Sequence, residues 1–218
     1  MPIARWGVWC ADGGEAESPD IGFVEPLLRR RLSRLAKMSL RVAHDCAQDL
    51  PGLRLVFASR HGDLTRTTAM LGDLADGEPL SPTVFSLSVH NASAGLFSIV
   101  RGDTTATTAV SAARSSFGFG LLEAAAQFAD DPGAPVLLVY ADEPAPDVYG
   151  AEAASTGPAH ALALLLASDA TNDLHCSMAP GDHSDSLAPH SLTFLDSLTS
   201  GSAGAWQGEG RRWAWQIQ

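Results

Sequence analysis

The stretch TTAVSAARSSFGFGLLEAAAQFADDPGAPVLLVYADE (Thr107–Glu143) decides the fold that this sequence predicts. The first residues of this stretch belong to the segment Thr104 to Val110, which is rich in Thr and Val as strands are. Phe117 to Ala129 has the composition and spacing of a helix, and Asp130 to Gly133 is a clear stop. Val136 to Tyr140 is a continuous apolar run, as in a buried strand. Strand, helix and strand in this order predict a βαβ unit and the α/β fold class.

The segments on either side extend this pattern. Strands are expected at Arg5–Cys10, Leu53–Ser59, Val84–Val89, His160–Ser168 and Arg211–Gln218, and helices at Pro26–Asp49, Leu64–Ala75 and Ala92–Val100. The polar stretch after Ser168 is expected to form loops with one short helix. The sequence thus predicts a mixed five-stranded sheet sandwiched between helices, with Leu53–Ser59, Thr104–Val110, Val136–Tyr140 and His160–Ser168 in one sheet.

Composition narrows the class of protein. The chain has 218 residues, 45% of them hydrophobic, and a net charge of −11 from 14 basic and 25 acidic residues. One domain over residues 1–218 is expected at this length. The acidic balance argues against nucleic acid or an anionic membrane as partner, and no apolar run is long enough for a membrane span. Cys10, Cys46 and Cys176 form no Cys-x-x-Cys pair, which favours a reducing cytoplasm.

Several familiar site motifs are absent. The sequence contains no Gly-x-Ser-x-Gly pentapeptide and no phosphate-binding loop of the Gly-x-x-x-x-Gly-Lys type. His175, His183 and His190 lack the short spacing of metal ligands. Ser115 and Ser116 stand at a strand-to-helix junction, where serines are more often helix caps than nucleophiles. We therefore expect no metal and no cofactor.

Three segments carry a resemblance to a known family. LSPTVFSLSVHNASAGLFSIVRG (Leu80–Gly102), TTAVSAARSSFGFGLLEAAAQFADD (Thr107–Asp131) and APVLLVYADE (Ala134–Glu143) resemble the N-terminal half of β-ketoacyl synthases, which belong to the thiolase superfamily. FASRHGDLTRT (Phe57–Thr67), together with SVHNASAG, is similar more narrowly to the chain length factors encoded beside aryl polyene ketosynthases. The resemblance implies one thiolase-like half of three layers, without the second half of a full synthase.

The sequence departs from that family at the nucleophile. The family's elbow normally reads Ser-Thr-Ala-Cys-Ser-Ser, and alignment puts Arg114 at the cysteine, or Ser115 after a one-residue shift. Neither is a thiol, and an Arg side chain cannot perform the acyl transfer of a thiolate. The His-Gly-Thr and Gly-x-x-x-His motifs that supply the family's two histidines are also missing after Tyr140. The expectation is a ketosynthase-derived subunit without condensation chemistry of its own.

The resemblance also implies contact residues. Thr104 to Ala113 would form the strand that meets a partner subunit, and the residues facing that partner or the growing acyl chain would be Leu96, Phe97, Val100, Thr104, Ala106, Thr108 and Phe117. Core packing is the alternative for the apolar members of this set. On the basic helix face, Arg30, Arg34 and Arg41 could dock an acidic partner such as an acyl carrier protein, or could simply be solvated.

Three hypotheses follow. The leading one is a non-catalytic, chain-length-factor-like partner of an active β-ketoacyl synthase in aryl polyene or fatty-acid-like biosynthesis, which shapes the acyl tunnel in a heterodimer. The alternative is a serine-dependent acyltransferase or thioesterase that uses Ser115 or Ser116 with His61 or His90 as base. The third is a homodimeric module that binds an acyl group or a carrier protein.

Overall fold

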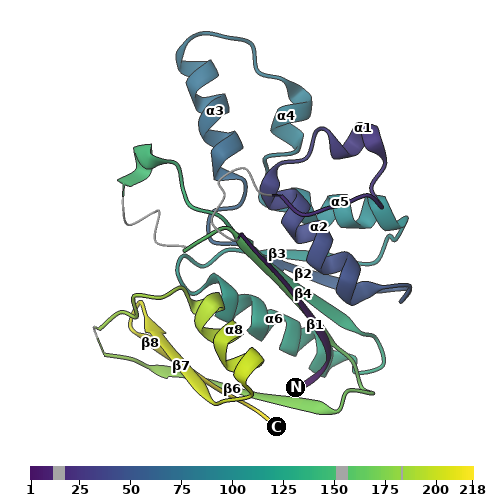
Figure 1. Cartoon of the computed structure of the whole chain (residues 1–218), viewed down its shortest axis with the longest axis vertical. Coiled ribbons are helices and arrows are strands. Elements are labelled where there is room, and N and C mark those ends of the chain that lie inside the picture. Colours follow the sequence, from purple (N-terminus) through teal and green to yellow (C-terminus); the bar gives the residue numbers. More distant parts are fainter. Residues whose placement is uncertain (12–17, 151–156, 183) are drawn as a thin grey trace.

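The fold is built on one sheet of eight strands in the order β3-β2-β4-β5-β1-β6-β8-β7 (Figure 1). A computed structural model describes residues 1–11, 18–150, 157–182 and 184–218, so His183 lies outside the described residues. The strands are β1 (Pro2–Cys10), β2 (Arg54–Ala58), β3 (Thr107–Val110), β4 (Val136–Asp142), β5 (His160–Leu166), β6 (Asn172–Pro180), β7 (Gly204–Gly208) and β8 (Arg211–Ile217). The helices are α1 (Pro26–Arg29), α2 (Arg34–Ala47), α3 (Leu64–Ala75), α4 (Pro82–Ser86), α5 (Ala92–Arg101), α6 (Ser116–Asp130), α8 (His190–Ser200) and a 3₁₀ turn, η1 (Asp147–Tyr149).

The centre of the sheet is buried on both faces. β2 runs parallel to β3 and β4, whereas β5 and β1 are antiparallel to their neighbours. Every residue of β4 and β5 is buried, as expected for apolar strands covered by helices on both sides. The prediction of one mixed sheet through these strands is confirmed. Because β2, β3 and β4 are parallel, the loops after them lie at the same edge of the sheet.

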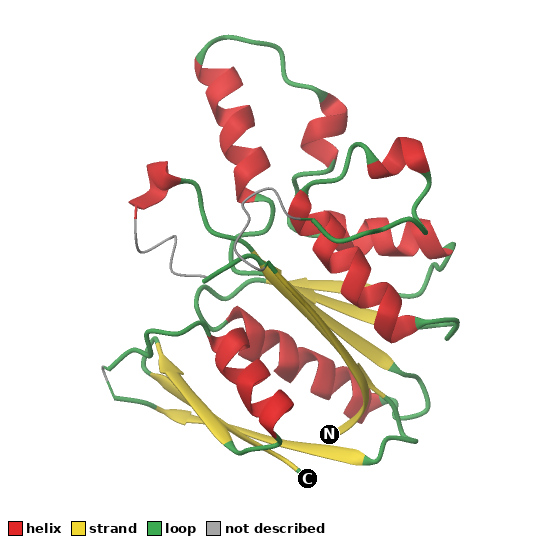
Figure 2. Ribbon diagram, in the orientation of Figure 1, coloured by secondary structure: helices red, strands yellow, loops and turns green. Residues whose placement is uncertain are grey.

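The elements form four layers rather than the expected three. α2 and α5 pack on one face of the sheet, and α6 and α8 pack on the other (Figure 2). The strands β6, β8 and β7 then cover the outer side of α6 and α8, so that these two helices lie between the central strands and the C-terminal ones. β6 stays in the sheet through only two residue pairs with β1, Pro2–Asp173 and Ile3–Asn172. The sheet therefore has eight strands, not five.

The structure corrects three local predictions. The helix expected from Pro26 to Asp49 is broken into α1 and α2, because Ser33 caps α2 by accepting the Ala36 N–H at 3.2 Å. Val84 to Val89 is not a strand: Ser81 and Pro82 begin the short helix α4 there. β6 lies in the stretch expected to be loops, and most of its side chains are exposed, so no apolar run marked it. No helix of the described residues is long and apolar enough to cross a membrane.

An aromatic cluster fastens the outer layer to α6. The His190 ring stacks on Trp206 with 4.4 Å between centroids, and Trp213 and Trp215 lie within 5.6 Å. His190 is 3% exposed, and burial lowers its pKa to about 3. Gly118 of α6 makes this packing possible, because a Cβ there would lie 2.7 Å from His190 Cε1.

Substitution of Gly120 tests whether α6 must pack this closely against the sheet. A Cβ at Gly120 would lie 2.7 Å from Ala58 Cβ, whereas a Cβ at Gly95 in α5 would meet nothing within 4 Å. Alanine favours a helix by about 1 kcal/mol over glycine, but overpacking a core costs roughly 1–3 kcal/mol. Gly120→Ala should therefore lower the free energy of unfolding in urea, and Gly95→Ala should raise it. Equal effects of both changes would contradict the close approach.

His190 should make stability depend on pH. The unfolded chain binds the imidazole proton near pH 6.5, and the folded chain binds it only near pH 3. Its contribution is therefore complete above pH 6.5 and is lost as the pH falls below that value. Between pH 6.5 and about pH 5 the free energy of unfolding should fall by about 1.5 kcal/mol more in the wild type than in His190→Phe. His160, whose pKa burial also lowers, is present in both proteins and cancels.

Candidate functional site

The candidate site is the turn between β3 and α6. β3 ends at Val110 and α6 begins at Ser116, and between them Ala113 has a φ of +46°. A side chain other than glycine is strained in this left-handed region. The Ser116 hydroxyl holds the turn, since its Oγ accepts the Ala112 N–H at 2.9 Å and donates to the Ala113 carbonyl at 2.7 Å. A strained residue in a strand-to-helix turn is the geometry of a nucleophile elbow.

Ala113 is the residue of this elbow that carries the backbone strain. Ala113 is one position before Arg114 and two before Ser115, the residues that sequence alignment placed at the nucleophile. Its side chain is exposed at the tip of the turn and is a methyl group. None of the three side chains is a thiol.

Glu209 covers the amino-terminal end of α6. Its Oε1 accepts the Arg114 N–H at 3.1 Å and its Oε2 accepts the Ser115 hydroxyl at 2.8 Å. Glu209 comes from the turn between β7 and β8, where its own φ is +55°. A carboxylate is favourable at this end of a helix because the helix dipole and the unpaired N–H groups attract negative charge. The chain thus fills this anion-favouring position with its own side chain.

The Arg114 side chain points to the C-terminal layer. Its guanidinium is 2.7 Å from Asp185 Oδ2, donates to the Ser186 carbonyl and lies 5.7 Å from the Trp206 ring centroid. Asp185 also accepts the Glu209 N–H at 3.1 Å. Arg114 therefore ties the elbow to the loop before α8 and to the β7–β8 turn. Sequence reasoning missed Glu209 and Asp185, because neither carries a local motif.

Comparison with known families agrees with this geometry. The family model described as β-ketoacyl synthase, N-terminal domain, matches residues 6–216. The chain belongs to this family. No curated protein matches the chain significantly.

Solved structures show the same synthase fold. A chain of the complex described as the ketosynthase ApeO with its chain length factor ApeC, from Xenorhabdus doucetiae, is similar at a TM-score of 0.81 and 27% identity over 99% of both chains. A chain of the ishigamide ketosynthase/chain length factor has a TM-score of 0.62 at 15% identity, over 91% of this chain and 72% of that one. A β-ketoacyl synthase from Burkholderia phymatum has a TM-score of 0.60 at 11% identity, over 78% and 53%. At these last two identities the likeness concerns the fold alone.

The cysteines of this synthase domain are not at the elbow. Cys46 lies in α2, on the opposite face of the sheet, and its Sγ is 3.7 Å from the Ala163 carbonyl. Burial raises the pKa of Cys46 to about 12 and that of Cys176 to about 11. Cys10 ends β1. At neutral pH the thiols of Cys46 and Cys176 are protonated and are therefore poor nucleophiles.

Neither serine of the elbow donates its hydroxyl proton to a histidine. Ser115 is buried and donates to Glu209, and Ser116 donates to the Ala113 carbonyl, so neither hydroxyl proton is directed to an imidazole. His90 Nε2 lies 3.0 Å from the Val110 carbonyl. Ser115 occupies the N-cap position of α6 without a side-chain cap bond, so the expected cap interaction is wrong for this residue.

Some of the residues expected to face a partner are buried, and others are half-buried or exposed. Leu96 and Phe97 are each 4% exposed and Phe117 is 0% exposed, and all three pack in the core, as in the alternative that the sequence left open for the apolar residues. Val100 is half-buried against the same core. Thr104 and Ala106 are exposed, and the half-buried Thr108 accepts a hydrogen bond from Gln127 Nε2 at 3.1 Å.

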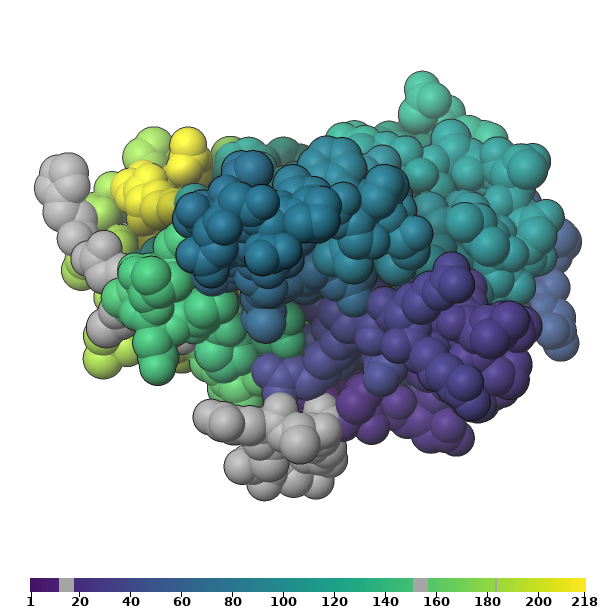
Figure 3. Space-filling model, turned by 90° about the horizontal axis from the view of Figure 1, so that it is seen from above, coloured from purple at the N-terminus to yellow at the C-terminus, as the bar shows by residue number. Residues whose placement is uncertain are grey.

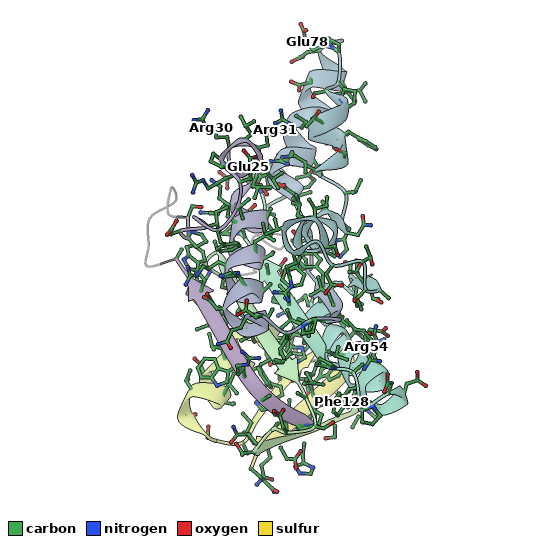
Figure 4. All side chains as sticks on the ribbon, turned by 90° about the vertical axis from the view of Figure 1, so that its right-hand side faces the viewer. Glu25, Arg30, Arg31, Arg54, Glu78 and Phe128 are labelled. Atoms are coloured by element: carbon green, nitrogen blue, oxygen red, sulfur yellow. The ribbon has the colours of Figure 1, made fainter. Side chains whose placement is uncertain are left out.

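The expected basic face does not form one free surface. Arg30 is exposed at the end of α1, as Figure 4 shows. Arg34 is paired instead, with its Nε 2.9 Å from Glu143 Oε2, and burial raises the pKa of that carboxyl despite the pairing. Arg41 is 2.8 Å from Asp45 one helical turn later.

A buried polar network supports the elbow from beneath. Asp142, 1% exposed, accepts the Ser59 hydroxyl at 2.8 Å and the Arg60 N–H at 2.9 Å, and it also binds the Tyr140 hydroxyl. The Arg60 carbonyl in turn accepts the Ser111 hydroxyl at 3.0 Å. The network therefore links the loop after β2 to the elbow.

A second serine and histidine meet near this network. His160 Nε2 is 2.7 Å from Ser191 Oγ, which is the distance of a nucleophile and its base. Each residue is only 1% exposed, so a substrate cannot reach either of them. Among the described residues, no three His, Cys, Asp or Glu groups lie together as metal ligands would.

Removal of the Glu209 carboxylate should loosen the elbow. Glu209→Ala leaves the Arg114 N–H and the Ser115 hydroxyl without their acceptor and removes a negative charge from the start of α6. The free energy of unfolding in urea should fall by about 1 kcal/mol. Glu78→Ala, which removes an exposed carboxylate elsewhere, is the matched control and should change little. If the two variants unfold alike, Glu209 does not stabilise the elbow.

Proposed function

We propose that this chain is a non-catalytic, chain-length-factor-like subunit that pairs with an active β-ketoacyl synthase. The observation that carries the proposal is the elbow: Ala113 holds the strained position, no thiol is present, and Glu209 covers the start of the helix. We propose further that Ala113, rather than Arg114 or Ser115, is the degenerate nucleophile position. An elbow retained without its nucleophile keeps the shape of a synthase and loses the acyl transfer step.

The comparisons support a ketosynthase as the partner. The structural relative at 27% identity comes from a complex of a ketosynthase with its chain length factor, and it matches this chain over 99% of its length. The ishigamide structure is a second ketosynthase and chain length factor pair. We therefore propose a heterodimer, and a place in aryl polyene or related biosynthesis, with an acyl carrier protein docking near the exposed Arg30.

The edge of β3 is the proposed contact with the synthase. β3 is an edge strand of the sheet, and no described strand pairs with its outer edge. Thr107 and Ala109 are exposed on it. Ile99 of α5 and Leu122 of α6 are 71% and 50% exposed, on the two helices that pack against β3. An open edge between two exposed apolar side chains suits pairing with a strand of another subunit.

A charge on this edge should prevent the pairing. Ala106→Asp places a carboxylate at the residue just before β3, where the partner would exclude water, and an unpaired buried charge costs several kcal/mol. We expect the variant to fold, by circular dichroism, and to lose copurification with the cognate ketosynthase. Ala179→Asp, on an exposed position of β6, is the matched control and should copurify normally. A complex retained by Ala106→Asp would place the interface elsewhere, and β-ketoacyl product made by this chain alone would overturn the non-catalytic role.

A further inference from the structure

The segment from α3 through α4, residues 64–86, stands out from the body of the molecule; we call it the arm. Figure 1 shows it rising above the sheet, and Figure 4 places Glu78 at its far end. Met70 is the only residue of the arm's two helices that is buried. Short helices of this size are marginal without packing, so an arm with so little core is expected to be completed by another surface.

The arm is strongly apolar on its exposed surface. Leu74 and Phe85 are 59% and 58% exposed, and Leu71, Leu80 and Val84 are between 37% and 53% exposed. With Met70 and Val89 several of them line a groove of about 390 Å³ between the two helices. Exposed apolar side chains gathered in one place mark a binding surface rather than ordinary scatter.

The base of the arm is held firmly, although its tip is free of the body. The Arg66 guanidinium donates to the carbonyls of Arg31 at 2.8 Å and Leu87 at 3.3 Å. On the other side, the Thr68 and Tyr149 hydroxyls lie 3.2 Å apart. An arm fixed at its base is already oriented for a partner, which reduces the ordering cost of binding.

One end of the groove lies near the carboxyl end of β3. Val89 lines the groove, and His90, the next residue, lies 3.0 Å from the carbonyl of Val110 at the end of β3. In the view from above, the blue surface of the arm joins the blue-green surface of the α5 segment (Figure 3). A single partner that pairs with β3 can therefore also reach the arm.

The charges at the tip indicate the chemistry of that partner. Asp73, Asp76 and Glu78 are exposed beside Leu74 and Leu80. In an arm-to-arm contact between two copies of this chain, these like charges would face one another and repel. The partner surface that would complement this tip is an apolar depression with Lys or Arg at its rim, which we call the seat.

We propose that the arm inserts into an apolar seat with a basic rim on the ketosynthase partner, and that it is a second contact besides β3. This inference rests on the proposed function, because it names a surface of the same complex. The apolar side chains supply the affinity, and the three carboxylates of the tip steer the approach and fix its orientation.

The test measures the affinity of the full-length chain for its cognate ketosynthase. Leu74→Asp and Phe85→Asp should each raise the dissociation constant by roughly 100-fold, the loss expected when a charge replaces an anchoring side chain. Leu187→Asp is the matched control, because Leu187 is 96% exposed outside the arm, and it should leave the affinity unchanged. Circular dichroism should show that all three variants fold, since each replaced residue is exposed.

The outcomes separate this inference from the proposed function. Tight binding by both arm variants, together with loss of binding by Ala106→Asp, would overturn the arm contact and leave the heterodimer standing. Absence of binding by the wild type would overturn both. A homodimer of the free chain that Leu74→Asp abolishes would assign the arm to a second copy and so overturn the seat on the ketosynthase.

A salt series tests the basic rim. The association rate of the wild type should fall as ionic strength rises, because salt screens the attraction of the tip carboxylates. The combined variant Asp73→Asn, Asp76→Asn and Glu78→Gln should show a weaker dependence on salt while it retains the apolar contacts. If its salt dependence equals that of the wild type, the rim is not basic.

Discussion

Close packing of α6 between two layers is the constraint on which the site depends. Gly120 lets the helix approach Ala58 and Leu138 of the central strands, and Gly118 lets it approach His190 and Trp213 of the outer layer. A side chain at either position would push α6 away from one of its two neighbours. The helix therefore has little freedom, and the elbow at its amino-terminal end is held in a fixed place.

The position of α6 explains why the elbow survives without a nucleophile. The elbow is strained at Ala113, and a strained backbone persists only where its surroundings determine it. Here the surroundings are Ser116 within the turn, the Asp142 network beneath it, and Glu209 from the C-terminal strands. The same outer layer that fixes the helix also supplies the carboxylate at its start. The C-terminal strands therefore both position α6 and fill the amino-terminal end of this helix.

Several exposed features surround this rigid centre. The edge of β3, Ile99, Leu122 and the arm offer apolar or unpaired surface, whereas β4 and β5 are buried along their whole length. The proposed association with a synthase would benefit from a fixed core that presents these surfaces without rearrangement. The bonds that Arg66 makes at the base of the arm serve the same purpose.

Local patterns determined a large part of this protein. The strands β2, β4 and β5 and the helices α3 and α6 follow from continuous apolar runs and helical spacing, and the missing thiol at the elbow is visible in the residues themselves. Tertiary structure alone decided the rest. Glu209 meets Arg114 across 95 positions, and Leu96 and Phe97 are core residues because α5 packs on the sheet. β6 has too few buried side chains to show a pattern, since its place depends on pairing with β8. Periodicity records which face of an element is buried, but it does not record which distant element will cover that face.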